Sequence, residues 1–183
     1  MSDLYDTIDT KLAAWLVAQP VFFVGTAPSG GDGHVNVSPK GMAGTFAVLG
    51  PRQVGYLDYF GSGIETIAHL RENGRIVVMC CAFTGPTKIV RLHGRGRAVL
   101  PDDPAFATLR PKFAKQREHG ARSIVVVDVE RVSDSCGYAV PRMDYVDDRN
   151  VLDLHQLKRP PEYYEQDAIA RNRASIDGLP GLG

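Results

Sequence analysis

A run of alternating residues at His34–Lys40 carries the clearest sign of chemistry in this sequence. The polar members of the run share one parity, and they are His34, Asn36, Ser38 and Lys40. If the run is a strand, they lie on one face, because successive side chains point to opposite faces. Such a face can hydrogen-bond the edge of a planar heterocycle and place a cation near a phosphate. A solvent-facing barrel edge has the same pattern, and the alternation leaves both interpretations open.

A second candidate lies at Gly61-Ser62-Gly63-Ile64-Glu65-Thr66. Ser62 and Glu65 have the S-x-x-E spacing of a capping box, which predicts that a helix begins here. The two glycines let the backbone approach a ligand closely, and a new helix directs free N–H groups and its positive dipole end outward. The segment therefore predicts a phosphate site, although an ordinary capped helix has the same residues.

A third candidate is the basic face of the segment that follows Lys88. Its charged parity comprises Arg91, His93, Arg95 and Arg97. A charged face on a half-buried strand is usually just solvated. The functional interpretation is that Arg91 contributes to an anion-binding pocket. Pairs such as His69 and Glu72 have no third ligand at a useful spacing, so we expect no metal site.

Hydrophobic periodicity predicts the elements that must position these residues. Apolar residues at helical spacing predict an amphipathic helix over 4–18, ended by Pro20. Strands are predicted at 21–26, 34–40, 46–49, 54–59, 76–83, 88–100 and 123–132. Further helices are predicted at 64–72, 103–118, 148–158 and 161–174. Six or seven strands in hairpin order, with helices inserted singly, predict a mainly β fold with added helices (α+β), built as an antiparallel barrel.

The length and the charge of the chain limit the classes of protein to which it can belong. The 183 residues suit one domain, with an N-terminal helix over 1–20, a barrel over 21–133, and a helical extension and tail over 134–183. Lys plus Arg and Asp plus Glu both number 21, so we expect no nucleic-acid partner. No apolar run approaches the ~18 residues of a membrane span, and the acidic start is unlike a signal peptide. Three cysteines without zinc spacing suggest buried free thiols in a reducing cytoplasm.

Three segments together resemble the pyridoxamine-5'-phosphate-oxidase-like flavoproteins, over roughly residues 15–130: "VFFVGTA…GHVNVSPKG", "VGYLDYFGSGIETIAHLRENGRIVVM" and "KIVRLHGRGRAV". The resemblance implies a split β-barrel, FMN, and a homodimer whose two flavins lie between the subunits. Carried over by position, it implies cofactor contacts at Asn36, Ser38, Lys40, Tyr56, Asp58, Ser62, Gly63, Thr66 and Arg91.

The chain also departs from that family. Pyridoxamine-phosphate oxidases carry an Arg-rich, Trp-containing C-terminal segment, whereas this chain has Trp15 alone and ends "SIDGLPGLG". Its 61–63 segment is Gly-Ser-Gly, with fewer basic residues than the family has around the phosphate. We therefore expect an FMN-dependent oxidoreductase with a different small-molecule substrate. An F420-dependent reductase (a deazaflavin enzyme) and a non-catalytic flavin-binding or storage protein remain the alternatives.

The C-terminal tail is the predicted roof of the site. Its apolar residues, Ile176, Leu179 and Leu182, are denser than a disordered tail needs. We expect residues 175–183 to pack across the flavin pocket of this subunit or its partner. The large polar-tipped side chains expected to help are Tyr138, Tyr163 and Tyr164.

Overall fold

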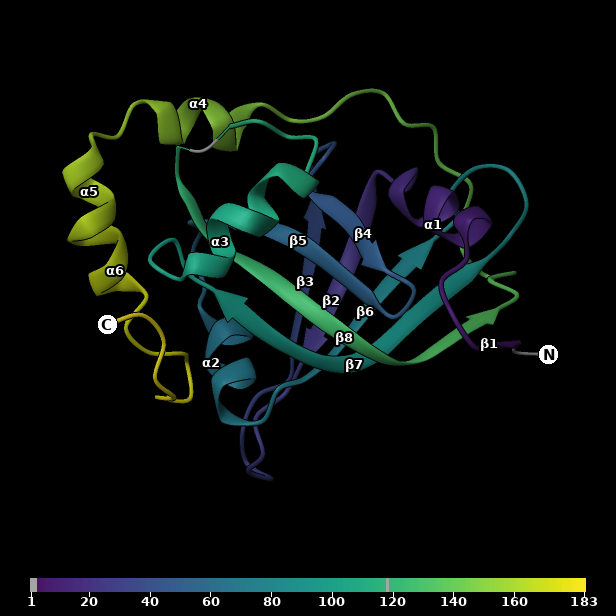
Figure 1. The fold of residues 1–183 in the computed structure, drawn as a ribbon, viewed down its shortest axis with the longest axis horizontal. Coiled ribbons are helices and arrows are strands. Elements are labelled where there is room, and N and C mark those ends of the chain that lie inside the picture. Colours follow the sequence, from purple (N-terminus) through teal and green to yellow (C-terminus); the bar gives the residue numbers. More distant parts are fainter. Residues whose placement is uncertain (1–2, 118) are drawn as a thin grey trace.

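One antiparallel sheet forms the centre of the computed structural model, which describes residues 3–117 and 119–183 (Figure 1). Seven strands follow the path β3-β2-β6-β7-β8-β5-β4, and the short β1 pairs with β8 off that path. The strands are β1 (Leu4–Tyr5), β2 (Val21–Thr26), β3 (Asn36–Gly41), β4 (Phe46–Gly50), β5 (Gln53–Tyr59), β6 (Arg75–Cys81), β7 (Ile89–Val99) and β8 (Ala121–Ser135). The predicted strands are thus confirmed, with shifts of a few residues at their ends.

The sheet curls until its two ends approach each other. β3 and β4 are neighbours in sequence, yet they stand at opposite ends of the strand path. Lys40 on β3 nevertheless reaches Asp58 on β5, with its Nζ 3.2 Å from Oδ1. This ion pair bridges the split between the sheet's ends. The mainly β architecture with added helices and a seven-stranded split barrel is confirmed.

The main core lies inside the curl, and α1 (Thr10–Val17) closes it. Alternate residues of the strands point inward, so Val90 and Leu92 on β7 are completely buried. Leu12 and Leu16 of α1 pack into the same cluster. A second apolar cluster, around Phe113, fills the space between the sheet and α3 (Pro104–Leu109).

The predicted N-terminal helix is wrong in its first half. Helix α1 begins only at Thr10, because Asp9 has extended backbone and its carboxylate accepts a hydrogen bond from Leu12 N at 2.7 Å. This N-cap fixes the helix start. Leu4–Tyr5 instead forms β1 and pairs with Val132–Ser133 of β8. Residues 1–2 lie outside the described residues.

The remaining helices are α2 (Glu65–Glu72), α3, α4 (Val151–Leu157), α5 (Pro161–Glu165) and α6 (Asp167–Arg171). The helix predicted over 103–118 is too long. It becomes a 3₁₀ turn at Arg110–Lys112, where Pro111 has no N–H to continue the helical ladder; residue 118 lies outside the described residues. The predicted helix 161–174 is divided at Gln166, whose φ of −119° and ψ of −74° lie well outside the usual α-helical values.

Gly94→Ala is expected to destabilise the protein by about 1–3 kcal/mol, because it overpacks the sheet. The register of β7 against β8 shifts between His93 and Gly94. A Cβ on Gly94 would lie 2.0 Å from the Asp128 carbonyl oxygen, so the two strands must separate. Urea denaturation measures the change. Gly30→Ala, with no atom within 4 Å of its Cβ, is the matched control, and equal midpoints for the two variants would contradict the prediction.

Candidate functional site

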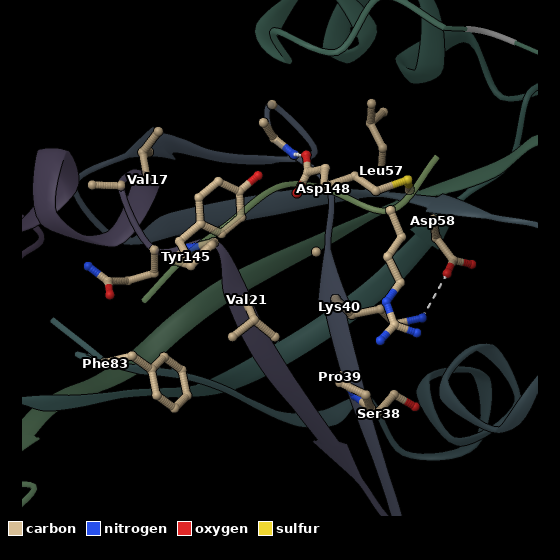
Figure 2. A pocket seen from close by; sticks show the side chains of 18 of the residues that line it. Val17, Val21, Ser38, Pro39, Lys40, Leu57, Asp58, Phe83, Tyr145 and Asp148 are labelled. Carbon is tan, nitrogen blue, oxygen red and sulfur yellow. Dashed lines mark hydrogen bonds and ion pairs between the residues drawn. The ribbon is translucent and has the colours of Figure 1, made fainter. Parts of the chain in front are cut away.

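A cavity of about 2230 Å³ opens beside β3 and β5, under the chain segment that links β8 to α4 (Figure 2). Typical pockets for one small ligand hold roughly 300–1,000 Å³. The cavity therefore has room for a cofactor and a second molecule together. Its walls are largely apolar, and a few charged and hydroxyl groups converge on its floor.

Strand β3 turns its polar parity toward this cavity. Ser38 and Lys40 line it, and both are half-buried. Of the alternate, apolar positions, Val35 and Val37 face the other way and are 72% and 67% exposed, whereas Pro39 also lines the cavity. The polar side chains of β3 therefore do not form a simple solvent-facing barrel edge, and their contact with a ligand stays a prediction. His34 lies before β3, and its Nδ1 pairs with Asp177 Oδ1 at 2.6 Å.

A buried ion cluster forms the floor of the cavity. Asp58 accepts from Lys40 Nζ at 3.2 Å and from Arg122 Nε at 2.8 Å. The side chains of Asp58 and Arg122 are each only 4% exposed. Arg122 Nη1 also donates to the Gly63 carbonyl at 2.7 Å and to Asn172 Oδ1 at 2.9 Å. Burial alone would raise the pKa of Asp58, but the charges of Arg122 and Lys40 outweigh burial and hold this pKa below its ordinary value.

The cluster of Lys40, Asp58 and Arg122 has a net charge of one positive unit. Two cations, Lys40 and Arg122, share the single carboxylate of Asp58. Because the side chains of Asp58 and Arg122 are buried, water screens their charges poorly, and such an excess attracts an anionic group. Arg122 is not among the residues predicted from the sequence, although it carries a signal. It is a charged residue within a valine-rich strand, where a charge is buried only when it is paired.

A chain of hydrogen bonds lies next to this cluster. Asn36 does not line the cavity but holds two hydroxyls that do. Its Oδ1 accepts from Ser38 Oγ at 3.0 Å, and its Nδ2 donates to Thr66 Oγ1 at 3.1 Å. The same Nδ2 donates to Thr26 Oγ1 at 3.0 Å, and Thr26 in turn contacts Nδ1 of the buried His69 at 3.0 Å. The site therefore has Ser38 and Thr66 at its surface and Asn36 behind them.

The Gly61-Ser62-Gly63 turn forms part of the cavity rim, but it is not a capping box. The N-cap of α2 is Ile64, with no side-chain cap, which puts Ser62 two residues too far out to reach the first helical N–H groups. Glu65 does not return to cap the helix start. Its carboxylate accepts from the backbone N of Ile176 in the C-terminal tail, at 3.3 Å.

Besides Asn36, which lies just behind the lining, two predicted site residues lie away from the cavity in this chain. Tyr56 is completely buried in the core, with its ring 5.4 Å from that of Phe22, and its neighbour Leu57 lines the cavity instead. Arg91 lies on the outer face of β7, where its Nη1 donates to Ser135 Oγ at 3.0 Å. Arg91 shares its parity with half-buried His93 and not with the core residues Val90 and Leu92.

The roof of the cavity comes from residues 143–152 and not from the tail. This segment runs from β8 along one side of the barrel to α4 (Figure 1). Backbone N of Met143 donates to the Phe83 carbonyl at 3.0 Å, and Asp148 Oδ2 accepts from Ala43 N at 2.7 Å, so both ends are anchored. Tyr145 and Asp148 of this segment are among the lining side chains in Figure 2.

The expectation that the tail covers the cavity of its own subunit is therefore wrong, while packing of the tail across the partner's cavity stays a prediction. Leu182 packs on Ile64 and Ile67 of the same chain, beside α2, and only Ile176 of the tail reaches the cavity rim. None of the three predicted roof tyrosines lines the cavity within the described residues: Tyr138, Tyr163 and Tyr164. Tyr138 is 83% exposed.

Cysteine, metal and membrane features add little to the site. Cys80 and Cys81 are buried free thiols, while Cys136 is exposed, contrary to the expectation that all three are buried. In residues 3–117 and 119–183, no group of three or more His, Cys, Asp and Glu side chains is placed to bind a metal ion. Over the same residues, no helix is long and apolar enough to cross a bilayer.

Comparison with known proteins gives consistent matches. The family model described as pyridoxamine 5'-phosphate oxidase matches residues 8–136. The pyridoxamine 5'-phosphate oxidase family protein ustO of Aspergillus flavus is 38% identical over 200 residues, covering 100% of this chain and 78% of that protein.

Among solved structures, HupZ of Group A Streptococcus aligns with a TM-score of 0.54 and 18% identity, covering 68% of this chain and 91% of that one. A variant of HupZ gives a TM-score of 0.56 at 17% identity, covering 70% and 99%. At these identities the likeness to HupZ shows a shared fold alone.

Proposed function

This chain belongs to the pyridoxamine 5'-phosphate oxidase family, and on that basis we propose that its cavity binds a flavin, FMN by preference. We further propose that the protein is a flavin-dependent oxidoreductase of a small molecule other than pyridoxamine phosphate. The observation that carries the proposal is the pair of cations, Lys40 and Arg122, on the floor of a large and mostly apolar cavity.

The residues present fit a flavin phosphate ester. A planar aromatic ring needs apolar walls, and Val21, Met42 and Leu57 line this cavity. A phosphate needs cationic donors, and the excess positive charge of the Lys40–Asp58–Arg122 cluster supplies them. The cavity volume leaves space for a substrate beside the cofactor.

Each group then has a role that follows from its position. Lys40 and Arg122 would hold the phosphate, and the Ser38 and Thr66 hydroxyls would hydrogen-bond polar atoms of the ring. Tyr145, on the segment above the cavity, would limit the access of water. A bound flavin itself supplies the redox chemistry, which is why the site needs few protein acids or bases.

The roof segment argues against a phosphorylated substrate. Acidic residues outnumber basic ones where this segment lines the cavity: Asp144, Asp147 and Asp148 against Arg149. Carboxylates at a cavity mouth repel an anionic substrate and favour a neutral or cationic one. We therefore propose a substrate without a phosphate, in keeping with the missing Arg-rich C-terminal segment.

The first test is flavin binding by the purified protein. We expect the protein to carry FMN on purification, or to quench the fluorescence of added FMN in an equilibrium titration. Preferential binding of added F420 would support a deazaflavin enzyme instead. Failure of a folded protein to quench flavin fluorescence at tens of micromolar flavin would refute the proposal. Rapid reoxidation of reduced flavin in the presence of candidate acceptors separates an enzyme from a storage protein.

We also propose that the protein is a homodimer with the flavins between its subunits. The outer face of β3, β2 and β6 supports this, because apolar residues align across it. Pro39, Phe23 and Met79 form one cross-strand row, and Val37 and Val77 lie in the next. Val90 on β7 does not belong to this face, because it is completely buried in the core. Val37 and Pro39 are exposed, and Phe23, Val77 and Met79 are half-buried. Contiguous apolar surface that is partly open to solvent is typical of an interface.

Arg91 gains a role in such a dimer. Register places Arg91 beside Met79, at the end of the Pro39–Phe23–Met79 row. Its guanidinium therefore lies on the proposed interface and not at its own cavity. We propose that it acts on the flavin held by the partner subunit.

Val37→Asp is expected to convert the dimer to monomer, because it places a charge in the middle of the apolar face. Val37 is 67% exposed in the single chain, so folding should be unaffected. Sedimentation velocity at micromolar concentration measures the effect. Val146→Asp, at a position 92% exposed on the roof segment, is the control for an added charge. A wild-type protein that sediments only as a 19.9 kDa species would contradict the dimer.

A further inference from the structure

His69 ends the hydrogen-bond chain behind the cavity and is the least expected member of it. The ring is completely buried on α2. Its Nδ1 lies 3.0 Å from Thr26 Oγ1, while Nε2 has no partner among the described residues. Burial lowers the pKa of His69, although Asp177, Glu65 and Glu72 act in the opposite direction. A neutral imidazole is therefore in place next to the site, and the proposed function does not yet use it.

The directions of the hydrogen bonds follow from counting protons. Both protons of the Asn36 amide are used, one on Thr26 and one on Thr66. Because Thr26 Oγ1 accepts from Asn36, its own proton is left for His69 Nδ1. We assign that proton to this bond, so that His69 accepts at Nδ1 and carries its hydrogen on Nε2. The other tautomer would make Thr26 accept from both Asn36 and His69.

The same count fixes what the two cavity hydroxyls can offer a ligand. The Ser38 hydroxyl donates its hydrogen to Asn36 Oδ1, so its oxygen lone pairs remain free to accept a hydrogen bond from a ligand. Thr66 accepts from Asn36, which leaves its proton to donate. Ser38 and Thr66 both line the cavity, so the site presents one acceptor and one donor side by side.

We propose that His69 is a positioning residue that, through Thr26 and Asn36, sets Ser38 as an acceptor and Thr66 as a donor, so that the cavity selects a ligand edge with an N–H next to a carbonyl. A lactam or imide edge has this pattern. The inference deepens the proposed function, because the pyrimidine ring of a flavin carries an N3–H between two carbonyls. A ligand whose ring has only acceptors along that edge would leave Ser38 unmatched, which costs affinity.

The first experiment tests the hydrogen-bond chain without any ligand. Nitrogen-15 chemical shifts of the imidazole distinguish the two neutral tautomers of histidine. We expect the His69 signals of the wild-type protein to show hydrogen on Nε2 and none on Nδ1. Hydrogen on Nδ1 would reverse the directions along the chain and overturn the proposal, whatever the protein binds.

The second experiment compares riboflavin with 3-methylriboflavin, which lacks the N3 proton. The wild-type protein should bind riboflavin about tenfold more tightly, the loss expected for one good hydrogen bond. Ser38→Ala should reduce this ratio to about one, because the acceptor is gone. Thr66→Val should weaken both flavins about equally, because it removes the donor to a carbonyl that both retain.

Two substitutions of His69, and one of Thr26, test whether His69 influences the ligand without touching it. His69→Leu removes the acceptor for Thr26 and should reduce the riboflavin preference, whereas His69→Asn places an amide oxygen near Nδ1 and should restore it. Thr26→Val breaks the chain at nearly constant shape, so it serves if His69→Leu fails to fold. A double variant that combines His69→Leu with Thr26→Val should lose no more of the riboflavin preference than either single variant, because both substitutions break the same chain of hydrogen bonds.

The outcomes separate this inference from the proposed function. Thr108→Val, on the exposed side of α3, is the matched control and should keep the wild-type ratio. Equal binding of the two flavins by the wild-type protein, or a full preference retained in Thr26→Val, would overturn the positioning role while leaving flavin binding intact. No binding of either flavin would refute the proposed function, and the tautomer of His69 would still decide the hydrogen-bond chain.

Discussion

Arg122→Met is expected to destabilise the protein by about 3–5 kcal/mol, the usual cost of removing one partner from a buried ion pair. The variant leaves the Asp58 carboxylate buried, with Lys40 as its remaining cation and the Ser123 hydroxyl as a further donor; the Lys40 side chain is 24% exposed. It also removes the donors to the Gly63 carbonyl and to Asn172, so the turn at the cavity rim and α6 lose a shared anchor. Urea denaturation at neutral pH measures the loss.

The pH dependence of this loss identifies its cause. In the wild type the folded-state pKa of Asp58 is lowered by its cationic partners, so the pair contributes stability above the unfolded-state pKa of about 3.9. That contribution disappears as pH falls through the lowered pKa. In Arg122→Met, burial is opposed only by Lys40, and the pKa of Asp58 rises. The stability gap between the two proteins should therefore be largest near pH 7 and should narrow as the pH falls below about 4.

A control and a contrary result complete this test. Arg97→Met, at an exposed position on β7, should change the midpoint by no more than about 0.5 kcal/mol. A stability gap for Arg122→Met that stayed constant between pH 7 and pH 3.5 would show that lost packing, and not the lost ion pair, is responsible.

Lys40→Ala is expected to weaken FMN binding about ten- to a hundred-fold. The reason is the loss of one charge-assisted contact to the phosphate, worth about 1.5–3 kcal/mol. Riboflavin has no phosphate, so its affinity should change far less, and the ratio of the two affinities isolates the phosphate contact. Fluorescence titration of both flavins measures it. Lys112→Ala, exposed near α3, is the charge-matched control.

Ser62→Ala tests the other side of the expected phosphate site. Because the N-cap of α2 is Ile64, this change should leave stability unaltered, whereas loss of a true N-cap costs about 1 kcal/mol. A smaller loss of FMN affinity than in Lys40→Ala is expected. Unchanged FMN affinity in Lys40→Ala would move that residue out of the phosphate site altogether.

The strands were predictable because their signal is local. Alternation in 34–40 and the apolar run at 76–83 each depend on the pleat of a single strand, which places neighbouring side chains on opposite faces. Glycine, proline and asparagine ended the segments where a turn was needed, as at Pro20 and Asn73-Gly74. The order of these local elements was also enough to indicate the family.

The alternation of side chains could not say which face of β3 lines the cavity. The curl of the sheet decides this, since it directs Ser38 and Lys40 into the cavity and leaves Val35 and Val37 outside. The same limit applies to β1, whose two residues continue a helical pattern in the sequence but gain more from pairing with Val132 and Ser133. Long-range pairing outweighed local propensity there.

The sequence by itself therefore determined the strands, their order and most of the polar residues that reach the cavity. Only the tertiary structure decided the charge partners, because they are far apart along the chain: Arg122 is 64 residues from Asp58, and 50 from Asn172. It likewise decided that the roof is formed by residues 143–152 and that Leu182 packs on α2. Charges buried beside a cavity are set by which elements the fold brings together, and periodicity within one element carries no information about that.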